Sequence, residues 1–158
     1  MYYSLIFNLF FALCVLPVEY VFAQDFGHPI PMREKGADTY YVRATIQGLG
    51  DTDFMVDTGS GYVTINENSL DTLQEQGEAV YVKNIVGKLA DGQLKVVPIY
   101  RISTINLGNE CILKNVEAAV FPGKTRQILG LSGLKKAAPF IFSFNPPKLV
   151  LSHCAAPA

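Results

Sequence analysis

An Asp-Thr-Gly-Ser turn between two apolar segments constrains this chain more than any other feature. The run from Phe54 to Ile65 reads Phe-Met-Val-Asp-Thr-Gly-Ser-Gly-Tyr-Val-Thr-Ile, so Asp57 follows an apolar stretch typical of a buried strand. A carboxylate there is costly to ionise unless hydrogen bonds or a partner stabilise it, which indicates an acid retained for chemistry. The alternative is a plain β-turn in which Asp57 only caps the amide of Gly59 or Ser60.

A second segment, Gln127-Ile128-Leu129-Gly130-Leu131, lies downstream. The two segments resemble, in order and spacing, the active-site loop of the aspartic proteases and the hydrophobic-hydrophobic-Gly strand behind it. Pepsin-like members carry two such loops on one long chain, whereas this sequence has 158 residues and one loop, because Asp51-Thr52-Asp53 lacks the glycine. The chain therefore resembles the single-domain retropepsin-like branch, and more narrowly its bacterial exported members, from about Thr39 to Ser152.

The resemblance implies an aspartic endopeptidase that cleaves peptide or protein substrates as a homodimer. Each of two identical chains would contribute Asp57 to a dyad across a two-fold axis, the commonest symmetry of oligomers. Two close carboxylates share one proton, so one member acts as a base on a bound water and the other as an acid. This chemistry needs no cofactor, no metal and no covalent nucleophile.

The resemblance also assigns supporting roles around Asp57. Thr58 would hydrogen-bond the facing loop across the dimer interface, and Gly59 would allow the tight turn and present an amide to the carboxylate. Ser60 resembles the outer hydrogen-bond partner of that carboxylate. Gly130 would permit close packing behind the loop.

The rest of the pattern predicts a mainly β, single-domain, retropepsin-like closed or semi-open β-barrel with one or two short helices. From Tyr40 onward, short segments rich in β-branched and aromatic residues are separated by Gly, Asp, Asn or Pro. One helix is expected over Glu67 to Gln76, with Asn66 as its N-cap, Leu70 and Leu73 on one face and Gly77 as its stop. A shorter helical turn is expected from Leu131 to Lys136.

A hairpin from Val86 to Pro98 is expected to centre on Ala90-Asp91-Gly92-Gln93, whose Asp-Gly pair favours a tight two-residue turn. In the family that the chain resembles, the hairpin in this place is a flap over the substrate. Ala90, Asp91 and Gly92 are therefore the candidate flap and substrate-binding residues, because their amides could pair with an extended peptide. The alternative is an ordinary surface hairpin.

The first residues are typical of an export signal. Leu5 to Val18 is almost entirely apolar, and Val21-Phe22-Ala23 resembles a signal-peptidase site, although no Lys or Arg precedes the apolar run. The sequence thus predicts a signal peptide over 1–23, an extended N-terminal arm without regular structure over 24–38 that could cross a partner subunit, and a protease domain over 39–154. Periplasmic export is the expectation. The alternatives are secretion and an uncleaved membrane anchor, the one case in which a membrane would be a partner.

The cysteines, histidines and charged residues bear on three further properties: a disulfide, a metal site and nucleic-acid binding. Cys111 and Cys154 remain after leader removal and would form a disulfide or stay as two buried thiols. His28 and His153 have no ligating neighbours at metal spacing, so no metal site is expected. Removal of Glu19 with the leader balances 13 basic residues with as many acidic ones, without the basic cluster of a nucleic-acid binder.

One alternative function of a different class stays open. A catalytically silent β-rich module could use the same groove to bind an extended peptide or to assemble an envelope complex. Retention of the whole Asp57-Thr58-Gly59-Ser60 set favours the enzyme, because a pure binder has no need of it. A serine or cysteine hydrolase is disfavoured, because no Gly-x-Ser-x-Gly context and no well-placed histidine base accompany Ser60 or Cys111.

Overall fold

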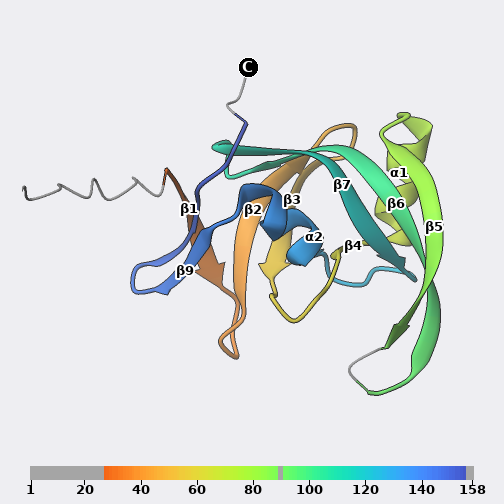
Figure 1. Cartoon of the computed structure of the whole chain (residues 1–158), viewed down its shortest axis with the longest axis horizontal. Helices are drawn as coiled ribbons and strands as arrows, with labels where there is room; N and C mark the ends of the chain where they lie inside the picture. Colours follow the sequence, from red (N-terminus) through yellow and green to blue (C-terminus); the bar gives the residue numbers. More distant parts are fainter. Residues whose placement is uncertain (1–26, 89–90, 156–158) are drawn as a thin grey trace, which may run out of the picture.

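Ten strands and a few short helical segments make up the protein in the computed structural model, which describes residues 27–88 and 91–155 (Figure 1). The strands are β1 (His28–Glu34), β2 (Tyr40–Ile46), β3 (Gly50–Val56), β4 (Val63–Asn66), β5 (Ala79–Lys88), β6 (Leu94–Leu107), β7 (Cys111–Phe121), β8 (Ile128–Leu129), β9 (Phe140–Phe144) and β10 (Pro147–Leu151). The helices are α1 (Glu67–Glu75), α2 (Leu131–Leu134) and the 3-10 turn η1 (Lys135–Ala137).

The strands form one sheet in the order β5-β6-β7-β4-β8-β3-β2-β1-β10-β9, and β6 also pairs with β2. This extra pairing closes a ring of six strands, β6, β7, β4, β8, β3 and β2. Most neighbours are antiparallel, but β3 runs parallel to β8 and β4 runs parallel to β7. The prediction of a mainly β retropepsin-like fold with two short helices is therefore confirmed.

The expectation of an irregular N-terminal arm is wrong for residues 28–34. β1 pairs with β10 on one side and with β2 on the other, all within one chain. Pro29 and Pro31 suggested a break in structure, yet Ile30 and Met32 alternate with them and are only 1% and 4% exposed. Burial of this apolar face in the core stabilises the strand despite the missing proline amides.

The core combines side chains of the ring with side chains of β1, β10 and α1. It contains one large aromatic side chain, Phe54 of β3, and many branched aliphatic side chains from β2, β4, β6 and β7. The predicted first helix is confirmed: Asn66 Oδ1 accepts a hydrogen bond from Ser69 N over 2.9 Å, and Leu70 and Leu73 are buried. The second helical stretch is confirmed as α2 followed by η1.

A disulfide joins Cys111 at the start of β7 to Cys154 after β10, with 4.8 Å between the two Cα atoms. Of the two alternatives left open by the sequence, a disulfide or two buried thiols, the structure has the disulfide. The amide of Ile112 also donates to Ala155 O over 3.3 Å, so the end of the described chain is held against β7. Within the described residues, no helix has the length and apolar character that a membrane span requires.

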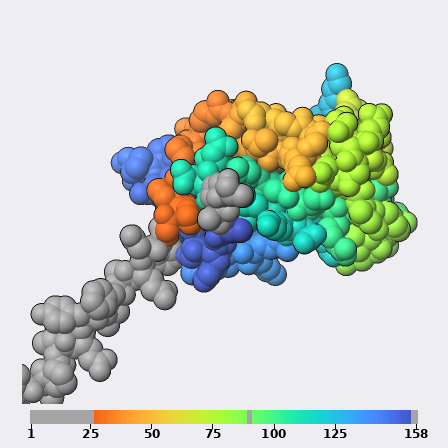
Figure 2. Space-filling model, turned by 90° about the horizontal axis from the view of Figure 1, so that it is seen from above, coloured from red at the N-terminus to blue at the C-terminus, as the bar shows by residue number. Residues whose placement is uncertain are grey.

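The two ends of the sheet lie at opposite ends of the molecule. In Figure 2 the yellow-green surface of α1 and β5 lies at one end, and the orange and blue surfaces of β1 and the C-terminal strands lie at the other. In Figure 1 the β5–β6 hairpin extends beyond the rest of the sheet.

Candidate active site

The loop that carries Asp57 links β3 to β4 and is anchored from behind by β8. The amide of Asp57 donates to Leu129 O over 3.2 Å, and the amide of Leu131 donates to Ser60 O over 2.9 Å. Gly130 lies between these two contacts, where an added Cβ atom would stand only 2.1 Å from Tyr62 O and 2.8 Å from Ser60 O. The close packing predicted for Gly130 is therefore present, and only glycine fits there without a shift of the loop.

The Asp57 carboxylate is half-buried and is held by its own turn. Its Oδ1 accepts a hydrogen bond from the amide of Gly59 over 2.8 Å, as the sequence predicts. This bond fixes the direction of the side chain. It fits a plain turn as well as a catalytic loop, so the surroundings of Asp57 must decide between them.

Thr58 and Ser60 were both expected to form hydrogen bonds around the active site, and the structure treats them differently. Thr58 is exposed, which leaves its hydroxyl accessible to a partner. The Ser60 hydroxyl donates to Tyr62 O over 2.8 Å, so it is not the partner of the Asp57 carboxylate in this chain. The local carbonyl competes for the hydroxyl donor, as is common for serine in turns.

A cavity of about 860 Å³ opens in front of Asp57. The β5–β6 hairpin supplies one wall through Ile85, Gly87, Lys88 and Val97. The opposite walls come from the Asp57 loop and from β7 and β8, with apolar side chains that include Phe121 and Ile128. A cleft that combines apolar walls with converging polar groups is the usual form of a ligand site, and Asp57 is the sole carboxylate among its described lining residues.

A second hollow of about 430 Å³ meets the first at Asp57 and includes Thr58. Its wall is aromatic: the ring of Tyr40 lies 5.4 Å from that of Phe142 and 5.6 Å from that of Phe144, in edge-to-face arrangements. Phe144 is 67% exposed. Asp57 therefore stands where an apolar cleft meets an uncovered aromatic surface.

The tip of the β5–β6 hairpin differs from the sequence prediction. Lys88 of β5 pairs with Leu94 of β6, and Gln93 lies outside the strand, so the tight two-residue turn at Asp91-Gly92 is wrong. Ala90 lies outside the described residues. The Asp91 side chain accepts from Gln93 N over 2.9 Å, and Gly92 has a φ of 85°, which favours glycine. Neither Asp91 nor Gly92 lines the cavity, whereas Gly87 and Lys88 do.

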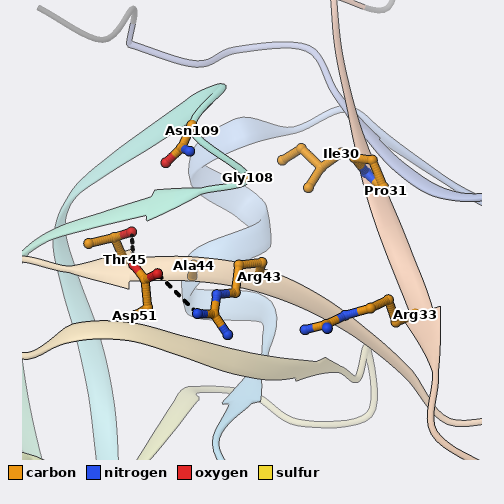
Figure 3. Close-up of a pocket in the computed structure, with 9 residues that line it drawn as sticks. All are labelled: Ile30, Pro31, Arg33, Arg43, Ala44, Thr45, Asp51, Gly108 and Asn109. Atoms are coloured by element: carbon orange, nitrogen blue, oxygen red, sulfur yellow. Dashed lines mark hydrogen bonds and ion pairs between the residues drawn. The ribbon is translucent and has the colours of Figure 1, made fainter.

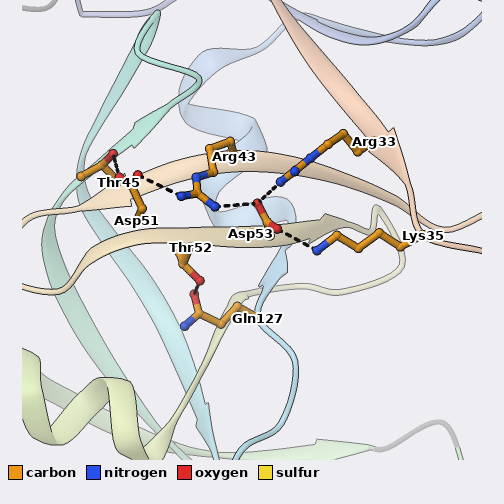
Figure 4. Close-up of polar contacts among 8 residues, drawn as sticks. All are labelled: Arg33, Lys35, Arg43, Thr45, Asp51, Thr52, Asp53 and Gln127. Carbon is orange, nitrogen blue, oxygen red and sulfur yellow. Dashed lines mark hydrogen bonds and ion pairs between the residues drawn. The ribbon is translucent and has the colours of Figure 1, made fainter.

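Side-chain hydrogen bonds hold the segment before β8 in place. Gln127 accepts from Thr52 Oγ1 of β3 over 3.1 Å (Figure 4). It also donates to Ser69 Oγ of α1 over 2.8 Å. The segment that contains Arg126 is thus fixed to the strand that leads to Asp57. These contacts join residues far apart in sequence, and periodicity gives no signal for them.

Figure 4 also shows an ion-pair network on the outer face of β2 and β3. Asp53 pairs with Arg33 and with Lys35, each over 2.7 Å. Partial burial raises the pKa of Asp53, but the hydrogen bonds and charges of Lys35 and Arg33 outweigh it and hold this pKa below its ordinary value. The Asp51 pKa is lowered by hydrogen bonds from Thr45 and Arg43.

A smaller pocket of about 290 Å³ lies beside this network, between β1, β2 and the β6–β7 turn (Figure 3). Its lining includes Arg43, whose guanidinium already binds Asp51 over 3.0 Å, and it contains no residue of the Asp57 loop. It is therefore separate from the candidate active site. Among residues 27–88 and 91–155, no group of three or more His, Cys, Asp or Glu side chains could hold a metal ion.

Comparisons with known proteins bear on the fold and on the family. The fold is similar to that of a retropepsin-like aspartic protease from Rickettsia conorii, with a TM-score of 0.57 over 81% of this chain and 91% of that chain, at 19% identity. The fold is therefore retropepsin-like. No curated protein matches the chain. A family model described as aspartyl protease matches residues 42–132, a range that contains Asp57 and Gly130. The chain belongs to the aspartyl protease family.

Proposed function

We propose that this protease is an aspartic endopeptidase that acts as a homodimer, in which two chains each supply Asp57. The carrying observation is the position of Asp57, at the junction of an apolar cleft and an exposed aromatic surface in a chain with one Asp-Thr-Gly loop. One carboxylate cannot act as acid and base at once. A second copy that brings its own Asp57 opposite the first completes the site.

The aromatic hollow supports a second copy as its cover. Thr58, Phe142 and Phe144 line it together with Asp57, so a chain whose Asp57 approaches the first must lie against these residues. Exposed aromatic side chains are common anchors of protein interfaces. Contact over Phe144 would remove an apolar side chain from water, and the Thr58 hydroxyl would be free to bond across the axis.

The mechanism follows from a shared proton. The ionised carboxylate takes a proton from a water molecule, and the water oxygen forms a bond to the carbonyl carbon of the substrate. The protonated carboxylate donates a hydrogen bond to the developing oxyanion. Collapse of the tetrahedral intermediate breaks the C–N bond, and the amine leaves with a proton from the dyad. The amide of Gly59 keeps the Asp57 carboxylate oriented during these steps.

Replacement of Asp57 by Asn tests the assignment. The change removes the proton-accepting oxygen at nearly constant volume, so the chain should fold while internal cleavage of an unfolded protein substrate disappears. Asp71→Asn, on the exposed face of α1, is the matched control and should retain activity. Cleavage by Asp57→Asn at the wild-type rate, measured by mass spectrometry of the fragments, would refute the proposal.

Dilution tests the homodimer. If each chain supplies half of the dyad, activity should follow the square of the chain concentration whenever the dimer is mostly dissociated, and Thr58→Ala should extend this regime to higher concentration. Sedimentation at the same concentrations, with and without a statine-type transition-state mimic, measures the assembly directly. A monomer with full activity at nanomolar concentration would contradict this part of the proposal.

Export to the periplasm remains a proposal as well. It rests on the apolar stretch and the Val21-Phe22-Ala23 site of the sequence. The disulfide between Cys111 and Cys154 supports an oxidising compartment. Fractionation of cells and N-terminal sequencing of the isolated protein distinguish a mature chain that begins at Gln24 from an anchored one.

A further inference from the structure

Two cationic side chains from different segments of the chain line the active-site cavity. Lys88 comes from the end of β5 in the hairpin, and Arg126 comes from the segment just before β8. Besides Asp57, they are the charged residues among the described lining of the cavity. Apart from Asp57, the other lining residues are apolar, glycine or hydroxyl-bearing, so these two side chains supply the positive charge of the cleft.

Neither cation has a carboxylate partner within the part of the chain that the structure describes. Some basic residues of the sheet do have one: Arg33, Lys35 and Arg43 pair with Asp51 or Asp53, and Lys83 pairs with Glu117 over 3.6 Å. The side-chain contact of Arg126 is with a thioether, because its Nη1 lies 3.6 Å from Met55 Sδ. Sulfur is a weak acceptor, whereas a guanidinium offers five donors in a fork that fits a carboxylate.

The contact with Met55 also places Arg126 close to Asp57 in the cavity. Met55 belongs to β3 and precedes Asp57 by two positions, and both line the same cavity. The Arg126 guanidinium therefore lies beside the strand that ends at the reacting carboxylate. A substrate side chain that reaches it belongs to a residue close to the cleaved bond.

The walls beside the two cations are apolar. Met55 and Ile128 flank Arg126, and Ile85 and Val97 belong to the same hairpin as Lys88. Successive side chains of an extended peptide point to opposite sides, so an apolar residue and an acidic neighbour would meet different walls of the cleft. Both groups would find complementary surroundings at once.

We propose that Arg126, assisted by Lys88, makes the cleft selective for extended peptides that carry Asp or Glu next to an apolar residue at the cleaved bond. The inference rests on the proposed proteolytic function. In a two-fold dimer the second copy places its own Arg126 on the other side of the dyad. Acidic side chains are then favoured on both sides of the cleaved bond.

The test begins with cleavage of a mixed peptide library by the wild-type dimer, which should enrich Asp and Glu close to the cut. A fluorogenic peptide based on the best sequence is then made with Glu, Gln or Lys at the enriched position. We expect kcat/KM to be about two- to fivefold higher for the Glu peptide than for the Gln peptide, the range of an exposed charged pair, because Arg126 and Lys88 are both exposed.

Three variants test whether Arg126 and Lys88 cause the preference for the Glu peptide. Arg126→Gln should remove most of the ratio between the Glu and Gln peptides, and Lys88→Gln should reduce it less. Arg126→Glu should shift the preference to the Lys peptide. Arg101→Gln, a change on an exposed part of β6 that does not line the cavity, is the matched control and should keep the wild-type ratio.

The pH dependence of the same ratio gives an independent readout. A free Glu side chain has a pKa of about 4.3, and pairing with a cation lowers it in the complex. The preference should therefore be complete above about pH 5 and decline as the pH falls through the lower, bound value. Asp57 and Tyr62 are the other ionisable groups lining the cavity, and an ionised Asp57 would act on a Glu side chain but not on Gln, so the pH series is repeated as peptide binding to the Asp57→Asn chain, in which that carboxylate is absent.

Binding separates failure of this inference from failure of the proposed function. The Asp57→Asn chain, which should not cleave, is titrated with the Glu and Gln peptides and monitored by fluorescence anisotropy. Tighter binding of the Glu peptide that depends on Arg126 supports the inference even if the wild type cleaves nothing. Equal binding of the two peptides, or a ratio unchanged by Arg126→Glu, would overturn it.

Discussion

Gly130→Ala should be among the most damaging single-atom additions to this protein. The added Cβ atom would stand 2.1 Å from Tyr62 O, 2.6 Å from Tyr62 C and 2.8 Å from Ser60 O. All three are backbone atoms, so no flexible side chain can rotate away, and the Asp57 loop itself has to move. The amide of Leu131, which donates to Ser60 O over 2.9 Å, would lose its acceptor in that shift.

The magnitude follows from the cost of overpacking, which is about 1–3 kcal/mol for added methylenes and higher when the neighbours cannot yield. We expect a loss of about 3 kcal/mol in the free energy of unfolding and a drop of about 10 °C in Tm. Proteolytic activity should fall further than stability, because the displaced residues flank Asp57.

The assay is thermal unfolding by circular dichroism at one fixed chain concentration, since dimerisation makes Tm concentration-dependent. Gly61→Ala is the control in the same loop, because a Cβ atom there meets no atom within 4 Å. It should change stability by about 0.5 kcal/mol or less. A Gly130→Ala chain that melts within about 2 °C of the wild type with full activity would refute the packing argument.

Two further perturbations test the disulfide and the ion-pair network. Reduction of the bond between Cys111 and Cys154, which are 43 positions apart, should remove about 4 kcal/mol by the chain-entropy relation and lower Tm by about 10 °C or more. Two free thiols in freshly isolated, unreduced protein would contradict the bond. Asp53→Asn should lower Tm at pH 7, and this deficit should shrink towards pH 2. The pKa of Asp53 is lower in the folded protein than in the unfolded chain, where it is about 3.9. Its charge therefore stabilises the fold above the unfolded-state pKa, and this stabilisation is lost as the pH falls through the folded-state pKa. An equal deficit at both pH values would show that the charge of Asp53 does not matter.

Local signals in the sequence predict what is locally determined. The first helix follows from Asn66, Leu70 and Leu73, whose capping and spacing lie within one segment, and the structure has it at almost the expected bounds. The support of Asp57 by the Gly59 amide and the close contact at Gly130 were likewise predictable from their motifs.

The features that the sequence did not predict correctly have a common physical cause. The prolines of β1 are poor strand formers in isolation, and the strand exists because Ile30 and Met32 are buried by distant parts of the chain. The Ser60 hydroxyl donates to the backbone carbonyl of Tyr62, and the position of that carbonyl is defined only in the folded turn. Lys88 and Arg126 were missed because their common property is the cavity they share, and that depends on tertiary structure.

The length of β6 has a consequence for motion. Residues Ile99 to Ile102 pair with both β5 and β7, and Ile105 to Leu107 pair with both β2 and β7, whereas the described pairings of Leu94 to Val97 are with β5 alone. The boundary falls at Pro98, which has no amide to donate. One strand therefore contains two classes of amide proton. Those near the cleft should exchange with solvent through local opening of the hairpin, and those beyond Pro98 only when the whole sheet unfolds. A bound peptide should slow the first class and leave the second unchanged.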